Sequence, residues 1–406
     1  MRSRTRWIVG LVIVGIGPLL GNVTQGHTPI ASRFTYNEHL FPIFERQCGS
    51  CHIEGGVGPM SLLTYQEAYP WTQSIREEVL ALRMPPWKAE DGFGDFSNGH
   101  VLPAHEMDMI LEWSAGGYPQ GPRDQTPSTS TISGGGWTYG PPTLELSLAE
   151  PFTLEANTTE TVRYFVLPTN LDEDHWVTNI DVIPGSRAVV RHVSIYIDTT
   201  GEGQAADEAS PEQGFSTGFL GQAPAAVWWP GQTLRTHERV GYSLPAGADI
   251  VARVVYKKTW ITEGQEFSDQ TRLGLHLTDK QLSTIEHIVV DSPLPNGREI
   301  NFTHRLDQDI TLYGLLPEIG IQASELQVTG TLPDGSTIPL LLIRNPDSDW
   351  PTRYLFDSPQ QLPSGTEVSI SAELAPGSDP TEVPSLFNSD APVRLLLDVT
   401  TDAVGN

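Results

Sequence analysis

The sequence is short of cysteine, methionine and basic residues, and each shortage narrows what the protein can do. Of 406 residues, 2 are cysteine and 5 are methionine, while 24 Lys and Arg stand against 50 Asp and Glu. The formal net charge of −26 repels polyanions and argues against nucleic acid as a partner. A diffuse acidic surface is instead typical of solubility, or of docking to a basic redox partner.

Several catalytic signatures are also missing. The sequence contains no Gly-x-Ser-x-Gly elbow, no phosphate-cradling Gly-Lys-Thr loop and no His-Glu-x-x-His zinc motif. The acidic turns at residues 172–174 and 347–349 lack the frame of an EF-hand calcium loop. We therefore expect no catalytic residues of these classes.

Both cysteines lie together, in residues 48–52 (CGSCH). This motif is the signature of c-type haem attachment, in which both thiols add to the haem vinyl groups and the histidine ligates the iron. A redox dithiol would need a preceding βα pattern, but residues 38–47 are predicted to be helical. A zinc site would need further ligands at matching spacing. We predict Cys48 and Cys51 as haem attachment sites, which leaves no disulfide, and His52 as the proximal iron ligand.

A second iron ligand is predicted in a proline-rich loop. Residues 62–82 are predicted to be helical, and Met84 follows, directly before two prolines. Prolines fix their own φ and restrict the preceding residue, so the loop is stiff and presents a thioether to the haem. Met/His ligation raises the haem potential and favours electron transfer. Met60 is the alternative ligand, whereas Met107 and Met109 are assigned to packing.

The start of the chain has the pattern of a secretory signal. Arg2, Arg4 and Arg6 precede the apolar residues 7–20. The apolar run is shorter than the ~20 residues that a membrane span needs. We expect residues 1–26 to be cleaved, with an uncleaved membrane anchor as the alternative. Because c-type haem is attached outside the cytoplasm, we expect a periplasmic or secreted protein.

Length and turn content predict several domains. A chain of 406 residues exceeds one typical domain, and 38 Gly and 33 Pro indicate many turns. Residues 27–122, which include a predicted helix over 105–115, are expected to form a small all-α cytochrome c domain. Residues 123–140 are rich in Ser, Thr, Pro and Gly and are expected to be a flexible linker.

The remaining chain predicts two all-β antiparallel, jelly-roll-like sandwiches, over residues 141–280 and 281–406. Short β-prone runs alternate there with turn dipeptides such as Asn-Gly and Asp-Gly. The clearest runs are residues 161–166, 191–197, 249–256, 272–277, 326–331, 338–343 and 368–374.

The haem-binding segment resembles a known module. Residues 48–52, 61–65 (SLLTY), 84–87 (MPPW) and 112–117 (EWSAGG) are similar to the cytochrome c module that precedes bacterial copper type II, ascorbate-dependent monooxygenase domains. That resemblance implies a c-type cytochrome fused to a copper-monooxygenase-like part.

The resemblance continues through the β-rich half. Residues 163–168 (RYFVLP), 184–187 (PGSR), 229–231 (WPG), 244–247 (LPAG) and 362–365 (LPSG) are similar to landmarks of peptidylglycine-hydroxylating-monooxygenase-like proteins. The resemblance implies two tandem β-sandwiches with one copper on each, facing across a cleft. One copper relays electrons, and the other activates oxygen to hydroxylate a C–H bond.

The copper ligands of that family do not carry over. Its His-His pair aligns with Arg191 and His192, and its third histidine aligns with Val255. Its His-x-His aligns with Glu318 and Gly320. Its methionine ligand has no counterpart, since every methionine lies at or before position 109. The resemblance therefore implies degenerate copper sites and makes copper an unlikely cofactor.

The remaining histidines are scattered along the sandwiches, and lone histidines on strands are usually packing or surface residues. A displaced copper site that combines His192 with His237 or His276 is the alternative. Glu318 could also ligate a different ion, although an exposed carboxylate is the simpler interpretation. For Trp228 and Trp229, core packing is favoured over a surface cleft.

Three functions follow from these patterns. The first is an exported c-type cytochrome that carries single electrons, with the sandwich pair as a docking scaffold for a redox partner protein. The second is an active copper-dependent monooxygenase fed electrons by the fused cytochrome. The third is a haem-containing interaction or sensor protein with an open sixth iron position. The intact haem motif and the missing copper ligands favour the first.

Overall fold

The computed structural model describes residues 31–99, 101–125, 136–217, 223–295, 297–378 and 391–401. The predicted signal peptide, residues 1–26, lies outside these ranges, as do residues 126–135 of the predicted linker. Within the described ranges, no helix combines the length and the apolar character that crossing a bilayer requires.

The regular elements before residue 126 are short helices. In chain order they are η1 Tyr36–Leu40, α1 Phe41–Gln47, α2 Tyr65–Ala68, η2 Tyr69–Trp71, α3 Thr72–Leu80, α4 Ala104–Ala115 and η3 Arg123–Gln125. Their shared core includes Tyr36, Phe44, Ile110 and Trp113, which are almost fully buried. The helices predicted over residues 38–47 and 105–115 are confirmed.

The single helix predicted over residues 62–82 is wrong in its extent. Residues 62–64 are not helical, and α2 begins at Tyr65, where the Thr64 hydroxyl accepts a hydrogen bond from the Glu67 amide at 3.3 Å. A 3₁₀ turn that contains Pro70 then separates α2 from α3. Proline lacks the N–H that a continuous helix requires, so the polypeptide forms two helices there.

The described chain after residue 135 is dominated by strands. In order they are β1 Leu144–Ser147, β2 Phe152–Leu154, β3 Glu160–Pro168, β4 His175–Ile183, β5 Val190–Asp198, β6 Ala226–Trp228, β7 Leu234–Arg235, β8 Val240–Leu244, β9 Asp249–Lys257, β10 Phe267–Asp269, β11 Arg272–Thr278, β12 Ser283–Thr284, β13 Glu286–Asp291, β14 Glu299–Arg305, β15 Ile310–Ile319, β16 Ala323–Thr331, β17 Thr337–Arg344, β18 Tyr354–Leu362, β19 Glu367–Leu374 and β20 Val393–Thr400. One helix, α5 Glu202–Ala209, follows β5. Every run predicted as a strand lies in a strand.

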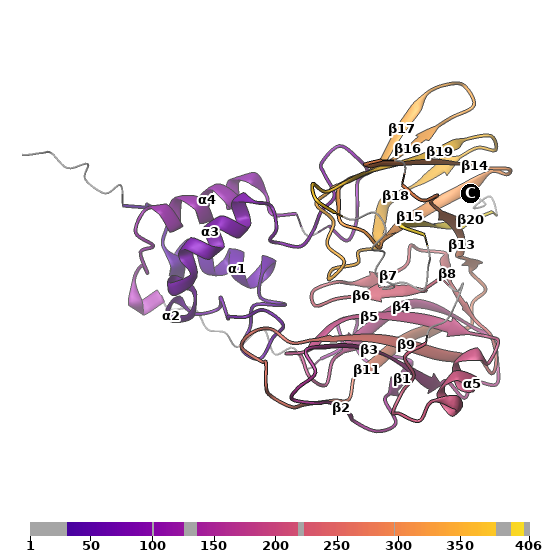
Figure 1. The fold of residues 1–406 in the computed structure, drawn as a ribbon, viewed down its shortest axis with the longest axis horizontal. Coiled ribbons are helices and arrows are strands. Elements are labelled where there is room, and N and C mark those ends of the chain that lie inside the picture. Colours follow the sequence, from indigo (N-terminus) through magenta and orange to yellow (C-terminus); the bar gives the residue numbers. More distant parts are fainter. Residues whose placement is uncertain are drawn as a thin grey trace, which may run out of the picture.

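The strands form two β-sandwiches, as the sequence predicts. In the first, the sheet β1-β11-β4-β8-β12 faces the sheet β3-β9-β5-β6, and a two-stranded sheet of β2 and β10 flanks them. In the second, the sheet β13-β20-β15-β18 faces the sheet β14-β19-β16-β17. Each pair of sheets encloses its own apolar core. Figure 1 shows the sandwiches stacked on one another, with α1 to α4 to one side of both.

Burial patterns show which sheets meet between the sandwiches. In the second sandwich, β19 of one sheet alternates buried and exposed residues, whereas β15 of the other sheet is buried along its whole length. β5 and β9 are also buried almost throughout. A sheet covered on both faces loses the alternating pattern. The β5-β9 sheet therefore packs against the β15-β20 sheet, with an apolar contact among Val227, Leu316 and Leu396.

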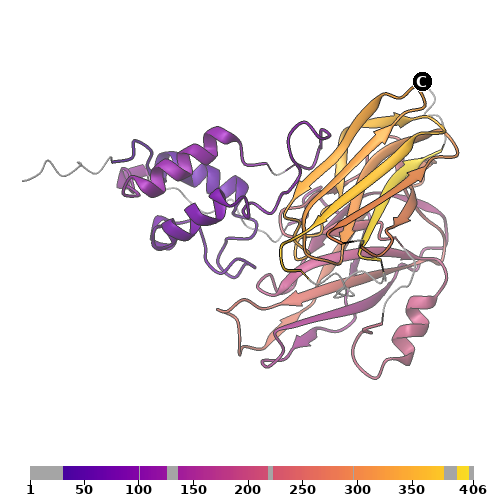
Figure 2. The ribbon, with the colours of Figure 1, turned by 45° about the horizontal axis from the view of Figure 1, so that its top comes forward.

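The loop over residues 87–98, between α3 and α4, packs against the second sandwich. Trp87 joins that sandwich's core, and its ring lies 5.0 Å from the ring of Tyr354. Farther along, the Ser97 amide donates to the Leu355 carbonyl at 2.8 Å, and Asn98 donates to the Arg353 carbonyl at 2.6 Å. Figure 2 shows this loop reaching the orange sandwich. These contacts hold the helical part against the second sandwich, in addition to its covalent connection through the polypeptide chain.

A buried ion pair lies where the sandwiches meet. Arg353 donates to Asp398 at 2.5 Å, and their side chains are 3 % and 1 % exposed. Arg353 also donates to the Tyr242 hydroxyl at 3.1 Å and to the Pro224 carbonyl, both in the first sandwich. Burial alone would raise the pKa of Asp398, but Arg353 and a hydrogen bond from His287 outweigh it and lower that pKa.

Replacing Asp398 with asparagine should destabilise the protein strongly. The substitution leaves the Arg353 guanidinium buried without its counter-charge, which typically costs about 3–5 kcal/mol. Urea denaturation of Asp398→Asn measures the loss. The control is Glu145→Gln, which breaks the exposed pair with Arg272 and should cost less than about 1 kcal/mol. Equal losses in the two variants would contradict the role assigned to the buried pair.

Candidate functional site

The two thiols and the imidazole of residues 48–52 open onto one cavity. α1 ends at Gln47, and the Cys48 carbonyl then accepts hydrogen bonds from the Cys51 and His52 amides at 3.2 and 2.8 Å. This tight turn directs all three functional side chains toward a cavity of about 310 Å³. Its volume falls within the range of ligand-binding pockets.

The His52 ring is oriented by the loop that follows it. Its Nδ1 lies 3.1 Å from the Met60 carbonyl oxygen, and a carbonyl can only accept, so Nδ1 carries the proton. Burial lowers the pKa of His52, which keeps the imidazole neutral. A Cβ at Gly58 would lie 2.6 Å from Nδ1, so only glycine fits there. Nε2 is left with its lone pair available to a metal.

The thiols of the motif are unsuited to redox exchange. Burial raises the pKa of Cys48 to about 12 and that of Cys51 to about 11. A catalytic dithiol instead has a lowered pKa, because the thiolate is its nucleophile. The Cys51 Sγ–H also donates to the Pro230 carbonyl at 3.5 Å. These thiols are therefore neutral and held in place.

Two methionines line the same cavity, Met60 and Met84. Met84 lies just after α3, where its amide donates to the Glu78 carbonyl at 3.4 Å. Three residues later Trp87 is anchored in the second sandwich, so the loop is held at both ends. Met107 and Met109 pack against the core of the helices, which confirms their predicted role.

The sandwiches complete the cavity wall. Arg191, Trp229, Thr259 and Trp350 line it from that side. The turn after Trp229 approaches the motif so closely that a Cβ at Gly231 would lie 2.6 Å from the Ser50 hydroxyl. Only Trp228 of the tryptophan pair packs in the sandwich core as predicted. Sequence reasoning missed this wall because no local pattern brings residues so far apart in the chain together.

The predicted degenerate copper positions of the first sandwich lie together. His192 on β5 faces Val255 on β9 in the strand register. Arg191 occupies the register shift beside them, and its guanidinium lies 5.0 Å from the centre of the Trp350 ring. Arg253 donates to His192 Nε2 at 3.3 Å. Burial, reinforced by the Arg253 charge, holds the pKa of His192 well below its usual value.

Glu318 and Gly320 lie at the end of β15, on the second sandwich. Glu318 is only 6 % exposed, so the expectation of an exposed carboxylate is wrong. Its strand is covered by the first sandwich, which the sequence of β15 alone does not reveal. Burial raises the pKa of Glu318 to about 7, against opposing effects from Arg394, Arg253 and Arg353.

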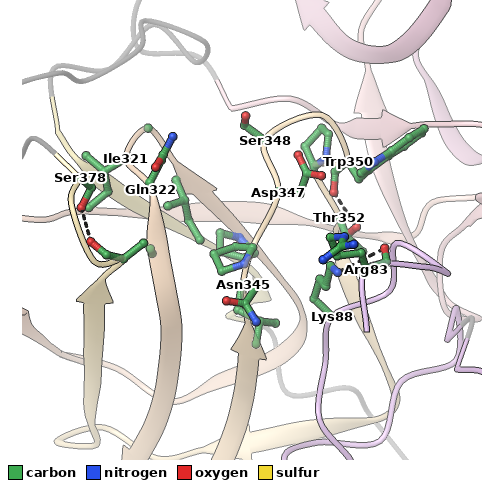
Figure 3. A pocket seen from close by; sticks show the side chains of 18 of the residues that line it. Arg83, Lys88, Ile321, Gln322, Asn345, Asp347, Ser348, Trp350, Thr352 and Ser378 are labelled. Carbon is green, nitrogen blue, oxygen red and sulfur yellow. Dashed lines mark hydrogen bonds between the residues drawn. The ribbon is translucent and has the colours of Figure 1, made fainter. Parts of the chain in front are cut away.

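A second cavity of about 650 Å³ lies between the 83–88 loop and the second sandwich. Figure 3 shows Arg83, Lys88 and Trp350 along one side, with Asn345 and Gln322 opposite. Lys88 donates to the Leu82 carbonyl at 2.7 Å. Gly320 lines this cavity, and Trp350 lines both cavities.

The sandwich histidines engage local partners. His287 lies 2.9 Å from Asp398, His276 lies 3.6 Å from Asp181, and the ring of His237 packs 5.5 Å from that of Tyr313. Within the described ranges, no three His, Cys, Asp or Glu side chains come together as a possible metal site. The displaced arrangement of His192 with His237 or His276 thus has no such cluster around it.

No family model matches the chain, and no curated protein matches it. A solved structure of PNGF-II in the P21 space group is similar over 63 % of this chain, with 11 % identity and a TM-score of 0.28. A Paenibacillus xanthan lyase is similar over 64 %, with 10 % identity and a TM-score of 0.19. The matched region spans 65 % of the PNGF-II chain and 26 % of the lyase chain. Likenesses this weak assign no family.

Glu318 should make stability depend on pH near neutrality. Its pKa is raised from 4.5 to about 7 in the folded protein, so the folded state binds the proton more tightly than the unfolded state. The resulting stabilisation is full below pH 4.5 and is lost as pH rises through about 7. Relative to Glu318→Gln, the wild type should lose roughly 3 kcal/mol of unfolding free energy over this interval.

Urea denaturation at a series of pH values measures the difference. The control is Glu299→Gln, an exposed position on β14 of the same sandwich, which should follow the wild type. If Glu318→Gln and the wild type decline in parallel, the buried carboxylate does not titrate near neutrality.

Proposed function

We propose that this protein is an exported c-type cytochrome that carries single electrons, with a copper-monooxygenase-like sandwich pair that serves as a docking scaffold. The observation that carries the proposal is the convergence of two neutral thiols, an imidazole with a free Nε2 and two thioethers on one cavity. The resemblance of residues 48–52 and 84–87 to a cytochrome c module points in the same direction.

Each of these residues has a specific part in holding haem c. Cys48 and Cys51 would form the thioether links, and His52 Nε2 would ligate the iron. We favour Met84 as the sixth ligand. The Met60 backbone is held beside the proximal imidazole by its hydrogen bond to His52 Nδ1. When bound, the haem supplies an iron that gains and loses one electron, at a potential that Met/His ligation raises.

The remaining lining residues keep water away from that centre. Phe44, Leu62, Ile75, Val79 and Ile110 form much of the helical wall, and each is buried. An apolar, low-dielectric surrounding disfavours net charge and so influences the potential of a bound redox group. The helices therefore provide an enclosure as well as ligands.

The side chains around the former copper positions favour a non-catalytic role for the sandwiches. The lone pair of His192 Nε2 is engaged by the Arg253 guanidinium, which already places a cation where a metal would bind. Val255 offers no donor atom, and Glu318 lies close enough to Arg394 and Arg253 for both to affect its pKa. Type II copper needs several imidazole or thioether donors arranged together.

Charge and location complete the proposal. The net charge of −26 would attract a basic redox partner protein over long range. Because c-type haem is attached outside the cytoplasm, we place the protein in the periplasm or among secreted proteins.

Purified holoprotein should contain one covalently bound haem iron per chain and no stoichiometric copper. The cysteines are positioned for thioether bonds, whereas the His192 lone pair is committed to Arg253. A pyridine haemochrome spectrum after acid–acetone extraction, combined with metal analysis after Cu(II) incubation and dialysis, measures both. Copper retained by the wild type and lost in His192→Ala would establish a copper protein instead.

Replacing Met84 with alanine should open the sixth iron position. We expect Met84→Ala to lose the ferric charge-transfer band of methionine–iron ligation, and its ferrous form to bind carbon monoxide. The wild type and the control Met60→Ala should keep the band and resist carbon monoxide. The opposite pattern would assign the ligand to Met60, and carbon monoxide binding by the wild type would favour a sensor.

A further inference from the structure

Arg191 is a buried cation without a counter-ion. It lies on β5 in the first sandwich, is 8 % exposed, and lines the cavity that holds Cys51 and His52. Its Nε has no hydrogen-bond partner, and within the described residues it takes part in no ion pair. The guanidinium instead lies over the face of the Trp350 ring, 5.0 Å from its centre.

The acidic side chains near this wall already have partners. Asp349, which precedes Trp350, accepts from Lys257 at 2.7 Å. Glu78 also lines the cavity, but both of its carboxylate oxygens accept from Arg83, at 2.7 and 2.8 Å. Arg191 lines the same cavity as Cys51 and His52. A buried charge is costly unless it is paired. The missing partner is therefore an anion within the cavity, beside the second cysteine of the motif.

We propose that Arg191 binds a propionate carboxylate of the covalently attached haem, reaching it from the sandwich across the domain interface. The inference rests on the proposed haem function, because attachment at Cys51 is what brings an anionic group to this wall. A guanidinium fork matches a carboxylate through two parallel hydrogen bonds. Trp350 supports the guanidinium from behind, by stacking against it.

Through this contact a residue of the sandwich would directly influence the haem potential. A cation beside the haem disfavours the ferric form, which carries one more positive charge than the ferrous form. Arg191 should therefore raise the haem potential. Arg191 would hold the carboxylate at the wall that Trp229 and Trp350 also line.

The test is the haem midpoint potential of Arg191→Gln, measured by spectroelectrochemical titration of intact holoprotein. At a fixed ambient potential we expect the ferric-to-ferrous ratio to rise about tenfold, a fall of 59 mV for a one-electron couple. The matched control is Arg272→Gln, which removes a guanidinium that also stacks on a tryptophan, Trp137, in the same sandwich but does not line the cavity. The control should keep the wild-type potential.

The other outcomes are equally decisive. If Arg191→Gln carries haem at the wild-type potential, the inference fails while the haem function stands; a wild-type protein without covalent haem overturns both. A wild-type potential that shifts with inorganic phosphate would assign Arg191 to a free anion instead. If Arg191→Gln does not fold, Arg191→Leu removes the charge and leaves an apolar side chain at the buried position. The same fall in potential in Arg191→Leu supports the inference, and no fall overturns it.

Discussion

The hydrogen bond from His52 Nδ1 to the Met60 carbonyl is the interaction on which the geometry of this site depends. It fixes the tautomer, turns Nε2 toward the cavity and places the Met60 backbone on the same side as the ring. Gly58 permits it, because any larger residue would meet the imidazole. A neutral, oriented imidazole beside two buried thiols favours iron in a haem over a free metal ion or a redox disulfide.

The cavity belongs to the domain interface rather than to the helices alone. Trp87 ties the methionine loop to the second sandwich, and the turn at Gly231 packs on the motif from the first. The helices and the sandwiches thereby share one cavity, to which both contribute lining residues. The predicted degenerate copper positions His192 and Val255 lie next to Arg191 in the strand register, and Arg191 lines the cavity. At residue 191 a guanidinium stands where the resemblance to copper monooxygenases implies an imidazole, and a guanidinium can pair with an anion but cannot ligate a metal.

Local patterns predicted much of this arrangement. The helices over residues 38–47 and 105–115 and the alternating strands depend on neighbouring residues, and the structure confirms them. The structure also places residues 48–52 and both candidate methionines on one cavity. The break between α2 and α3 at Pro70 is predictable in principle, because proline lacks the N–H that a continuous helix needs. The burial of Glu318 and the cavity-lining role of Arg191 and Trp350 could not be predicted, because they depend on how separate sheets and helices dock. In the sequence, only the resemblance to copper monooxygenases draws attention to Arg191, at a position where it implies a copper ligand.

Anomalous X-ray scattering from crystals of the holoprotein, recorded on both sides of the iron and copper absorption edges, is the most direct test of the division between a haem half and a copper-free half. A single iron peak is expected in the cavity between His52 and Met84, with no copper peak after crystals are soaked in Cu(II). A copper peak beside His192 or Glu318, or a cavity without iron, would contradict it.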